Sequence, residues 1–311
     1  MIQIGKLKFK KERVVLSLLV LPFIAFIIAF CYIPLGGWII AFVNYKPGLK
    51  IWQCDWAGLY YFRLIFKEWR KMSRVLQNTL AIAGLGLICA PLPALFAIFL
   101  SELPSPRYKK IVQTMTTIPN FVSWVIVYAL CYALFSSEGV LNQVLLKAGV
   151  IDTVTNILGN KNATWFFQTA LGVWKTQGWN AIIYFAAISG IDSELYDAAS
   201  VDGAGRWAKI VHITIPGISS TFFVLLLLQI SNILSLGTDQ YLAFYNSMVA
   251  DKITVLDLYV YRLGIVTQDY SYGTAVGMFK SLISILLLFC IFRKIGTPVP
   301  RHRNSVPLQM E

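Results

Sequence analysis

The sequence predicts an all-α, polytopic membrane protein, and two observations support that fold class. Of the 311 residues, 57% are hydrophobic and only 14% are charged, whereas soluble domains are about a quarter charged and somewhat under half apolar. Apolar runs of about 20 residues recur along the chain, and each is long enough to cross a hydrocarbon layer of roughly 30 Å as a helix. Residues 1–311 are therefore expected to form a single transmembrane domain.

Six transmembrane helices are expected. They lie at residues 14–33 with apolar continuation to Phe42, 76–100, 112–135, 165–190, 214–236 and 274–292. The basic stretch before the first run is typical of a secretory signal, but the run continues past Pro22 without a small-residue cleavage site. We therefore interpret it as an uncleaved first span.

An even number of spans places both termini on one side of the membrane. Basic residues gather at both ends of the chain, at Lys6, Lys8, Lys10, Lys11 and Arg13 and at Arg293, Lys294, Arg301 and Arg303. The positive-inside rule then favours the cytoplasm for both termini. The net charge of +12 is scattered in short clusters beside the apolar runs, so it indicates membrane flanks and no nucleic-acid partner.

The loops on the other side are expected at about 44–75, 136–164 and 237–273. Within the first, Tyr60–Val75 mixes aromatic and basic residues, which suits a helix at the membrane interface in contact with lipid. Within the last, residues 253–265 have helical apolar spacing, which predicts a short external helix packed on the bundle.

The loop at about 191–217 has the pattern of two short helices joined by a glycine turn. Ser193 is expected to cap the first helix, Glu194 to favour its first turn and Asp202 to cap the second. Trp207, Ile210 and Val211 would share one side of the second helix. Gly203 allows the bend and Pro216 helps to orient the fifth span. On spacing alone, an ordinary surface hairpin explains the loop equally well.

The same loop resembles the EAA loop of binding-protein-dependent ABC importer permeases. Asp197-Ala198-Ala199, then Asp202-Gly203-Ala204, Ile213 and Pro216 follow that motif, with Asp197 in place of Glu and Ile215 in place of Leu. Asn78-Thr79, Ile118-Pro119 and the stretch from Tyr272 to Lys280 extend the resemblance over nearly the whole chain. Within the family, the chain looks most like polysaccharide-type sugar permeases.

The resemblance implies a type I ABC importer permease architecture in a bacterial cell membrane, and a function in ATP-driven oligosaccharide import. It implies a second permease subunit, a cytosolic ATPase dimer that carries ATP and Mg, and an extracellular sugar-binding lipoprotein. The residues that would couple to the ATPase are Glu194, Asp197, Ala198, Ala199, Asp202, Gly203, Ala204, Ile213 and Pro216.

Polar residues inside the predicted spans are candidates for the substrate pathway. An ionisable group in hydrocarbon costs on the order of 2.5–3.5 kcal/mol on insertion scales and usually faces an interior, which draws attention to Lys175 and Lys280. Amides and hydroxyls suit sugar hydroxyls but also form interhelical hydrogen bonds. The candidates are Asn120, Ser123, Lys175, Gln177, Asn180, Gln229 and Asn232.

Catalytic motifs are missing from the sequence. It contains no GxxxxGK[ST] loop, HExxH or GxSxG, and its five cysteines include no CxxC pair. We therefore expect no enzymatic activity, no metal site and no cofactor bound by this chain. Two alternatives stay open: an ion-coupled secondary transporter, which the scarcity of acidic residues in spans two to six disfavours, and a membrane-embedded enzyme.

Overall fold

The computed structural model describes residues 11–295, and the side chains of 18–290 and of Arg293. The terminal basic clusters that suggested the orientation lie largely outside these residues. All regular secondary structure in the described chain is helical, apart from one isolated bridge between Val43 and Trp56. This confirms the all-α fold class. The single domain stays a prediction, since the chain divides into two compact units, Met1–Lys67 with Leu263–Phe279, and Glu68–Arg262 with Lys280–Glu311.

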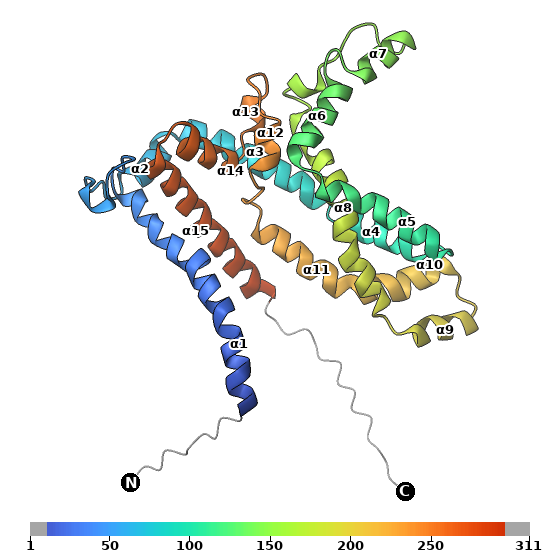
Figure 1. Ribbon diagram of the computed structural model, residues 1–311. Helices are drawn as coiled ribbons and strands as arrows, with labels where there is room; N and C mark the ends of the chain where they lie inside the picture. The colour runs from blue at the N-terminus through green and yellow to red at the C-terminus, as the bar shows by residue number, and fades with distance from the viewer. Residues whose placement is uncertain (1–10, 296–311) are drawn as a thin grey trace, which may run out of the picture. The chain divides into compact units, whose positions relative to one another are not determined.

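In the first unit, a long apolar helix is followed by an irregular loop and a short amphipathic helix (Figure 1). Helix α1 covers Lys11–Ile27 and continues through a π-helical turn, Ile28–Tyr32, into a 3₁₀ helix, Ile33–Phe42. After the loop, α2 covers Tyr60–Lys67. The unit also holds the start of α15, Tyr270–Ile295, and Ser271 Oγ ties that start to the loop by donating to the Val43 carbonyl at 2.7 Å.

The second unit contains the remaining helices. They are α3 Trp69–Ile88, α4 Pro91–Ser101, α5 Pro106–Thr117, α6 Trp124–Phe135, α7 Val140–Lys147, α8 Thr164–Ser189, α9 Ser193–Val201, α10 Arg206–Lys209, α11 Ile215–Ser231, α12 Asp239–Ala243, α13 Ala250–Ile253 and α14 Leu256–Tyr261. Figure 1 shows α8 running beside α4 and α5. Small residues at Ala94, Ala97 and Ala181 are buried where α4 meets α8, so these backbones approach closely.

Five helical segments of the described chain are long and apolar enough to cross a membrane. They are Leu18–Phe42, Trp69–Ser101, Trp124–Lys147, Arg206–Ser231 and Tyr270–Cys290. The predicted fourth span, 165–190, coincides with the 26-residue helix α8, whose polar side chains keep it out of that group. The count of six spans is therefore approached but not confirmed.

The third span was placed wrongly. A continuous helix was expected at 112–135, but the chain breaks between α5 and α6 through a 3₁₀ turn, Ile118–Phe121. Pro119 has no N–H to donate to a helical hydrogen bond, and Val122 and Ser123 are extended. The apolar segment consequently begins at Trp124 and runs into the expected loop at 136–164, where α7 is helical.

Two loop predictions are settled by the packing. The stretch Tyr60–Val75 is two helices, because the chain turns at Glu68 between α2 and α3. The short helix expected at 253–265 is present as α14, and Val255 and Leu258 are fully buried in a core shared with α3 and α6. This short helix is therefore part of the packed structure, as the apolar spacing predicted.

Candidate functional site: a polar cavity and an exposed helical loop

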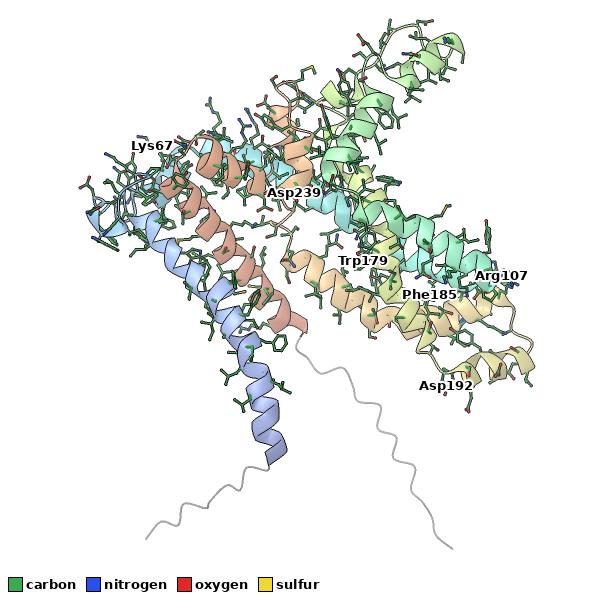
Figure 2. All side chains as sticks on the ribbon, in the orientation of Figure 1. Lys67, Arg107, Trp179, Phe185, Asp192 and Asp239 are labelled. Carbon is green, nitrogen blue, oxygen red and sulfur yellow. The ribbon has the colours of Figure 1, made fainter. Side chains whose placement is uncertain are left out.

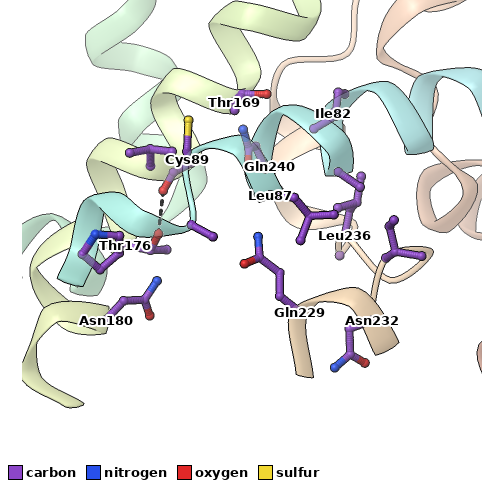
Figure 3. A pocket seen from close by; sticks show the side chains of 18 of the residues that line it. Ile82, Leu87, Cys89, Thr169, Thr176, Asn180, Gln229, Asn232, Leu236 and Gln240 are labelled. Atoms are coloured by element: carbon purple, nitrogen blue, oxygen red, sulfur yellow. Dashed lines mark hydrogen bonds between the residues drawn. The ribbon is translucent and has the colours of Figure 1, made fainter. Parts of the chain in front are cut away.

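A cavity of about 610 Å³ lies within the second unit. Its wall is built from α3, α4, α8 and α11 and from the chain that follows α11, with Trp124 of α6 at one side. Figure 3 shows side chains from these elements around the space. The wall combines apolar side chains, such as those of Phe222 and Leu225 on α11, with small and polar ones, so amide and hydroxyl groups line only part of the space.

The polar part of the cavity wall consists mainly of uncharged amides and hydroxyls. These side chains are Gln168, Thr169, Thr176, Gln177, Asn180, Gln229, Asn232, Ser235, Thr238 and Gln240. The Nε2 atom of Gln240 donates to Gln168 Oε1 at 2.9 Å, whereas Gln177 Oε1 is buried with no hydrogen-bond partner in the described structure. A buried amide oxygen without a partner is costly, so Gln177 is ready to accept a hydrogen bond from a solute.

Of the seven predicted pathway residues, four line the cavity: Gln177, Asn180, Gln229 and Asn232. The other three lie outside its wall. Ser123 caps α6, since its hydroxyl accepts from the Ile126 N–H at 3.4 Å. Asn120 belongs to the 3₁₀ turn before that helix and accepts a bond through its backbone carbonyl.

Lys175 stabilises the helix break instead of facing the cavity. Its ammonium donates to the backbone carbonyls of Pro119 at 3.1 Å and Asn120 at 2.6 Å, and lies 5.4 Å from the Trp124 ring centroid. The side chain is 7% exposed. The break leaves carbonyls without helical partners, and the lysine satisfies two of them. The hypothesis that this lysine meets a substrate carboxylate therefore has no support in the geometry.

Several lining residues were not among the sequence candidates. On α8, Thr169, Gly172 and Thr176 are spaced at helical intervals with the predicted Asn180, and that face of small and polar residues is a pattern that could have revealed them. Asp239 and Gln240 come from the loop predicted at 237–273, where no periodicity pointed to a cavity. Asp239, labelled in Figure 2, is the one lining residue in the described chain that carries a full charge at neutral pH.

Burial and charge act together at Tyr241, in the short helix α12. The side chain is 3% exposed, and burial, with a smaller contribution from the negative charge of Asp257, raises the pKa of its phenol. Tyr241 is therefore a neutral hydroxyl in the cavity wall.

The second candidate region is the helical loop formed by α9 and α10. Glu194 lies in the first turn of α9 as expected, but the N-cap is Asp192 and not Ser193, because the Asp192 carboxylate accepts from the Glu194 N–H at 3.0 Å. Asp202 was expected to cap the second helix; it ends the first instead, and Gly205 precedes α10. Asp192 is labelled in Figure 2.

Gly203 makes the bend between the two helices. Its φ of +78° lies in the left-handed region, where residues with a side chain are strained. The Gly203 N–H donates to the Ser200 carbonyl at 3.1 Å, and the Ala204 N–H donates to the Ala199 carbonyl at 2.8 Å. This pair of bonds closes the end of α9 in a Schellman motif, so the glycine determines where the chain turns.

The loop exposes apolar side chains on its outer surface. Leu195 is 53% exposed, Val201 89% and Trp207 69%. Of Trp207, Ile210 and Val211, which were expected to share one side of the second helix, only Ile210 is buried. Asp197, Ala198 and Pro216 are exposed, and Ala199, Ala204 and Ile213 are half-buried.

Hydrogen bonds hold this exposed surface in place. The Tyr196 hydroxyl pairs with Thr214 Oγ1 at 3.0 Å, and Lys209 Nζ donates to Ser200 Oγ at 2.6 Å. Beyond them, a π-helical turn, Ile210–Thr214, leads into α11, whose first turn contains Pro216. The loop is thus an ordered apolar surface that continues into an apolar helix.

The fold and the two regions define a class: a multi-pass helical membrane protein with a cavity partly lined by amides and hydroxyls, and with an ordered helical loop. Comparison with known proteins agrees. Residues 84–296, more than half of the chain, match the binding-protein-dependent transport system inner membrane component family. The chain belongs to this family, whose members are transport components, and the family resemblance expected from the sequence is confirmed.

Curated relatives match most of the chain. Protein LplB of Bacillus subtilis (strain 168) is 39% identical over 278 residues, which are 88% of this chain and 86% of the relative. The polygalacturonan/rhamnogalacturonan transport system permease protein YteP of the same organism is 38% identical over 277 residues, 88% of this chain and 85% of the relative.

Solved structures match the fold as well. A chain of a bacterial ABC transporter involved in the import of the acidic polysaccharide alginate is 31% identical, with a TM-score of 0.80 over 92% of this chain and 97% of that chain. A chain of the alginate transporter in complex with an alginate pentasaccharide-bound periplasmic protein is 32% identical, with a TM-score of 0.81 over 92% and 96%. The type I ABC importer permease architecture is thereby confirmed.

Proposed function

We propose that this chain is a permease subunit of an ATP-driven, binding-protein-dependent importer of oligosaccharides. The observation that carries the proposal is the cavity of about 610 Å³, in which the polar part of the wall consists mainly of amides and hydroxyls. Neutral amides donate to and accept from sugar hydroxyls at once. The named substrates of similar permeases and transporters, polygalacturonan or rhamnogalacturonan and alginate, are saccharides too.

The mechanism assigns a conformational task to this chain and the chemistry to other subunits. ATP and Mg bind to a cytosolic ATPase dimer, which docks on the exposed apolar surface of α9 and α10. Movement of this loop passes into α11, because the helical chain is continuous from Arg206 to Ser231. The cavity then opens to one side of the membrane and afterwards to the other.

The remaining partners follow from the same proposal. A second permease completes the pathway, an extracellular sugar-binding lipoprotein delivers the oligosaccharide, and both termini lie in the cytoplasm. A periplasmic protein that carries an alginate pentasaccharide is present in one of the similar structures, which supports the delivery step. In this scheme the chain catalyses no reaction of its own and binds no cofactor.

A matched pair of glycine variants tests the proposal in the reconstituted complex. Gly203 has a φ of +78° and Gly205 a φ of −71°, and no atom lies within 4 Å of a Cβ added at either position. Gly203→Val therefore distorts the turn through backbone strain, at a cost of roughly 1–2 kcal/mol, and Gly205→Val does not.

The measurement is ATPase activity stimulated by sugar-loaded binding protein, together with uptake. We expect stimulation to be lost in Gly203→Val and retained in Gly205→Val, at equal amounts of assembled complex. Equal stimulation of both variants would show that the turn at Gly203 does not transmit movement. Failure of the wild-type complex to take up any oligosaccharide would contradict the function itself.

A further inference from the structure

The ion pair between Lys280 and Asp257 in the second unit is half-buried, whereas the other ion pairs of the described chain are exposed. The side chains of Lys280 and Asp257 are 18% and 15% exposed, whereas those of Arg74 and Asp251 are 55% and 56% exposed. A buried ion pair seldom stabilises a protein more than apolar residues of similar volume. We therefore look for the role of Lys280 and Asp257 in the positions of the groups that they contact, and not in the stability that they add.

Asp257 connects α15 to the cavity wall. One carboxylate oxygen receives the Lys280 ammonium from α15, and the other accepts from the Gly237 N–H at 2.8 Å. Gly237 belongs to residues 235–241, which we call the wall segment because all seven line the cavity. Its φ of +84° is left-handed, so the direction of the wall segment depends on this one residue and on its bond.

Helix α14 and the wall segment are each attached to a further helix by hydrogen bonds. Helix α14, which carries Asp257, is held on α3 because the Leu256 N–H donates to Thr79 Oγ1 at 2.9 Å and Asn78 Nδ2 donates to the Thr254 carbonyl at 3.0 Å. The far end of the wall segment is held on α8 through Gln240. The hydrogen bond from Gly237 to Asp257 therefore attaches the first half of the wall segment to α14.

We propose that Asp257 and Lys280 are positioning residues for transport: Lys280 holds the Asp257 carboxylate where it fixes the wall segment, and this sets the affinity of the cavity for its solute. The proposal rests on the proposed import function and adds a structural determinant of affinity to it. Loss of the Gly237 bond would let the wall segment move and would weaken solute binding without breaking the coupling loop.

A charge swap separates positioning from simple stabilisation. In the double variant Asp257→Lys/Lys280→Asp the ion pair is re-formed, but a lysine at position 257 cannot accept the Gly237 N–H. Lys280→Arg keeps both interactions. Arg74→Met is the matched control, because it removes an ion pair that is exposed and distant from the cavity wall.

The measurement is the concentration dependence of oligosaccharide uptake by the full complex in proteoliposomes. We expect the swapped pair to assemble and to raise KM about tenfold, the size of one lost hydrogen bond to a charged group, with Lys280→Arg and Arg74→Met within about twofold of wild type. A wild-type KM in the swapped pair would show that Asp257 and Lys280 only stabilise the fold, and it would overturn the proposal.

A second readout does not depend on transport. Ser235 lies in the wall segment and is exposed, so Ser235→Cys in a background without the five native cysteines reports movement through its rate of modification by a water-soluble thiol reagent. We expect faster modification in the swapped pair and in Lys280→Met, but not in Arg74→Met. Equal rates would refute the positioning role. A shifted rate in a complex that imports no oligosaccharide would refute only the import function.

Discussion

At the scale of single residues, the same residue type takes different tasks according to which carbonyls or charges lie near it. Lys175 lies in α8 and Lys280 lies in α15, which are both long helices. Lys175 satisfies carbonyls at a helix break, and Lys280 pairs with Asp257. An ammonium in an apolar surrounding must find the nearest acceptors, and those acceptors come from distant parts of the chain.

Replacement of Lys175 should affect stability and not sugar preference. Lys175→Met leaves the Pro119 and Asn120 carbonyls without their donor, at a cost of about 1–3 kcal/mol. We expect a lower Tm of the assembled complex with an unchanged ratio of uptake between acidic and neutral oligosaccharides. Lys147→Met, at an exposed position of α7, is the control and should leave Tm unchanged. A changed ratio of acidic to neutral oligosaccharide uptake would show that Lys175 contacts the substrate.

Replacement of Gln177 should have the opposite pattern. Its Oε1 is buried without a partner, so Gln177→Leu removes an unsatisfied acceptor at nearly constant volume. We expect Tm to stay the same or to rise slightly and KM for oligosaccharide uptake to rise by about fivefold, since a hydrogen bond to the solute is lost. A lower Tm with unchanged KM would show that Gln177 serves the fold alone.

At the scale of elements, close packing between α8 and α5 positions the helix break. A Cβ added at Gly178 would lie 2.2 Å from the Thr116 carbonyl oxygen, a backbone atom that cannot turn aside, whereas at Gly172 the nearest atom is 3.7 Å away. Lys175 and Gly178 are three residues apart on α8 and therefore face the same neighbour. The glycine allows the approach and the lysine completes the contact.

Alanine substitutions at these two glycines provide a direct test. Gly178→Ala should force α5 and α8 apart and lower the stability of the complex by about 2 kcal/mol or more, whereas Gly172→Ala should be tolerated or slightly stabilising within the helix. Thermal unfolding of the purified complex measures both. If Gly178→Ala unfolds at the wild-type temperature, the close approach of α5 and α8 is not needed.

At the scale of the whole molecule, the charge in the cavity wall has the opposite sign to the net charge of the chain. The chain has a formal net charge of +12, yet the cavity wall in the described residues includes the acidic Asp239 and no lysine or arginine. A net positive chain could suggest a cavity for acidic sugars, but its positive charges lie elsewhere. This subunit therefore offers hydrogen bonds to neutral parts of a saccharide.

Removal of the Asp239 charge should consequently change selectivity. Asp239→Asn is expected to favour acidic over neutral oligosaccharides by about two- to fivefold, since like charges a few ångströms apart in water repel by roughly 1 kcal/mol. Competition between a uronate and a neutral oligosaccharide during uptake measures the ratio. Glu138→Gln removes an exposed acid outside the cavity wall and should leave the ratio unchanged. No shift in Asp239→Asn would show that its carboxylate lies apart from the solute.

The sequence by itself determined the fold class and the helical loop with its turn at Gly203, because both are encoded in local patterns. Apolar runs specify helices in hydrocarbon wherever they occur, and Gly203 specifies its left-handed turn through its own lack of a Cβ. Only the tertiary structure decided which polar residues face the cavity. Lys175 lies outside the cavity wall and Asp239 lies in it, because these placements depend on a helix break and on loop packing that join distant segments.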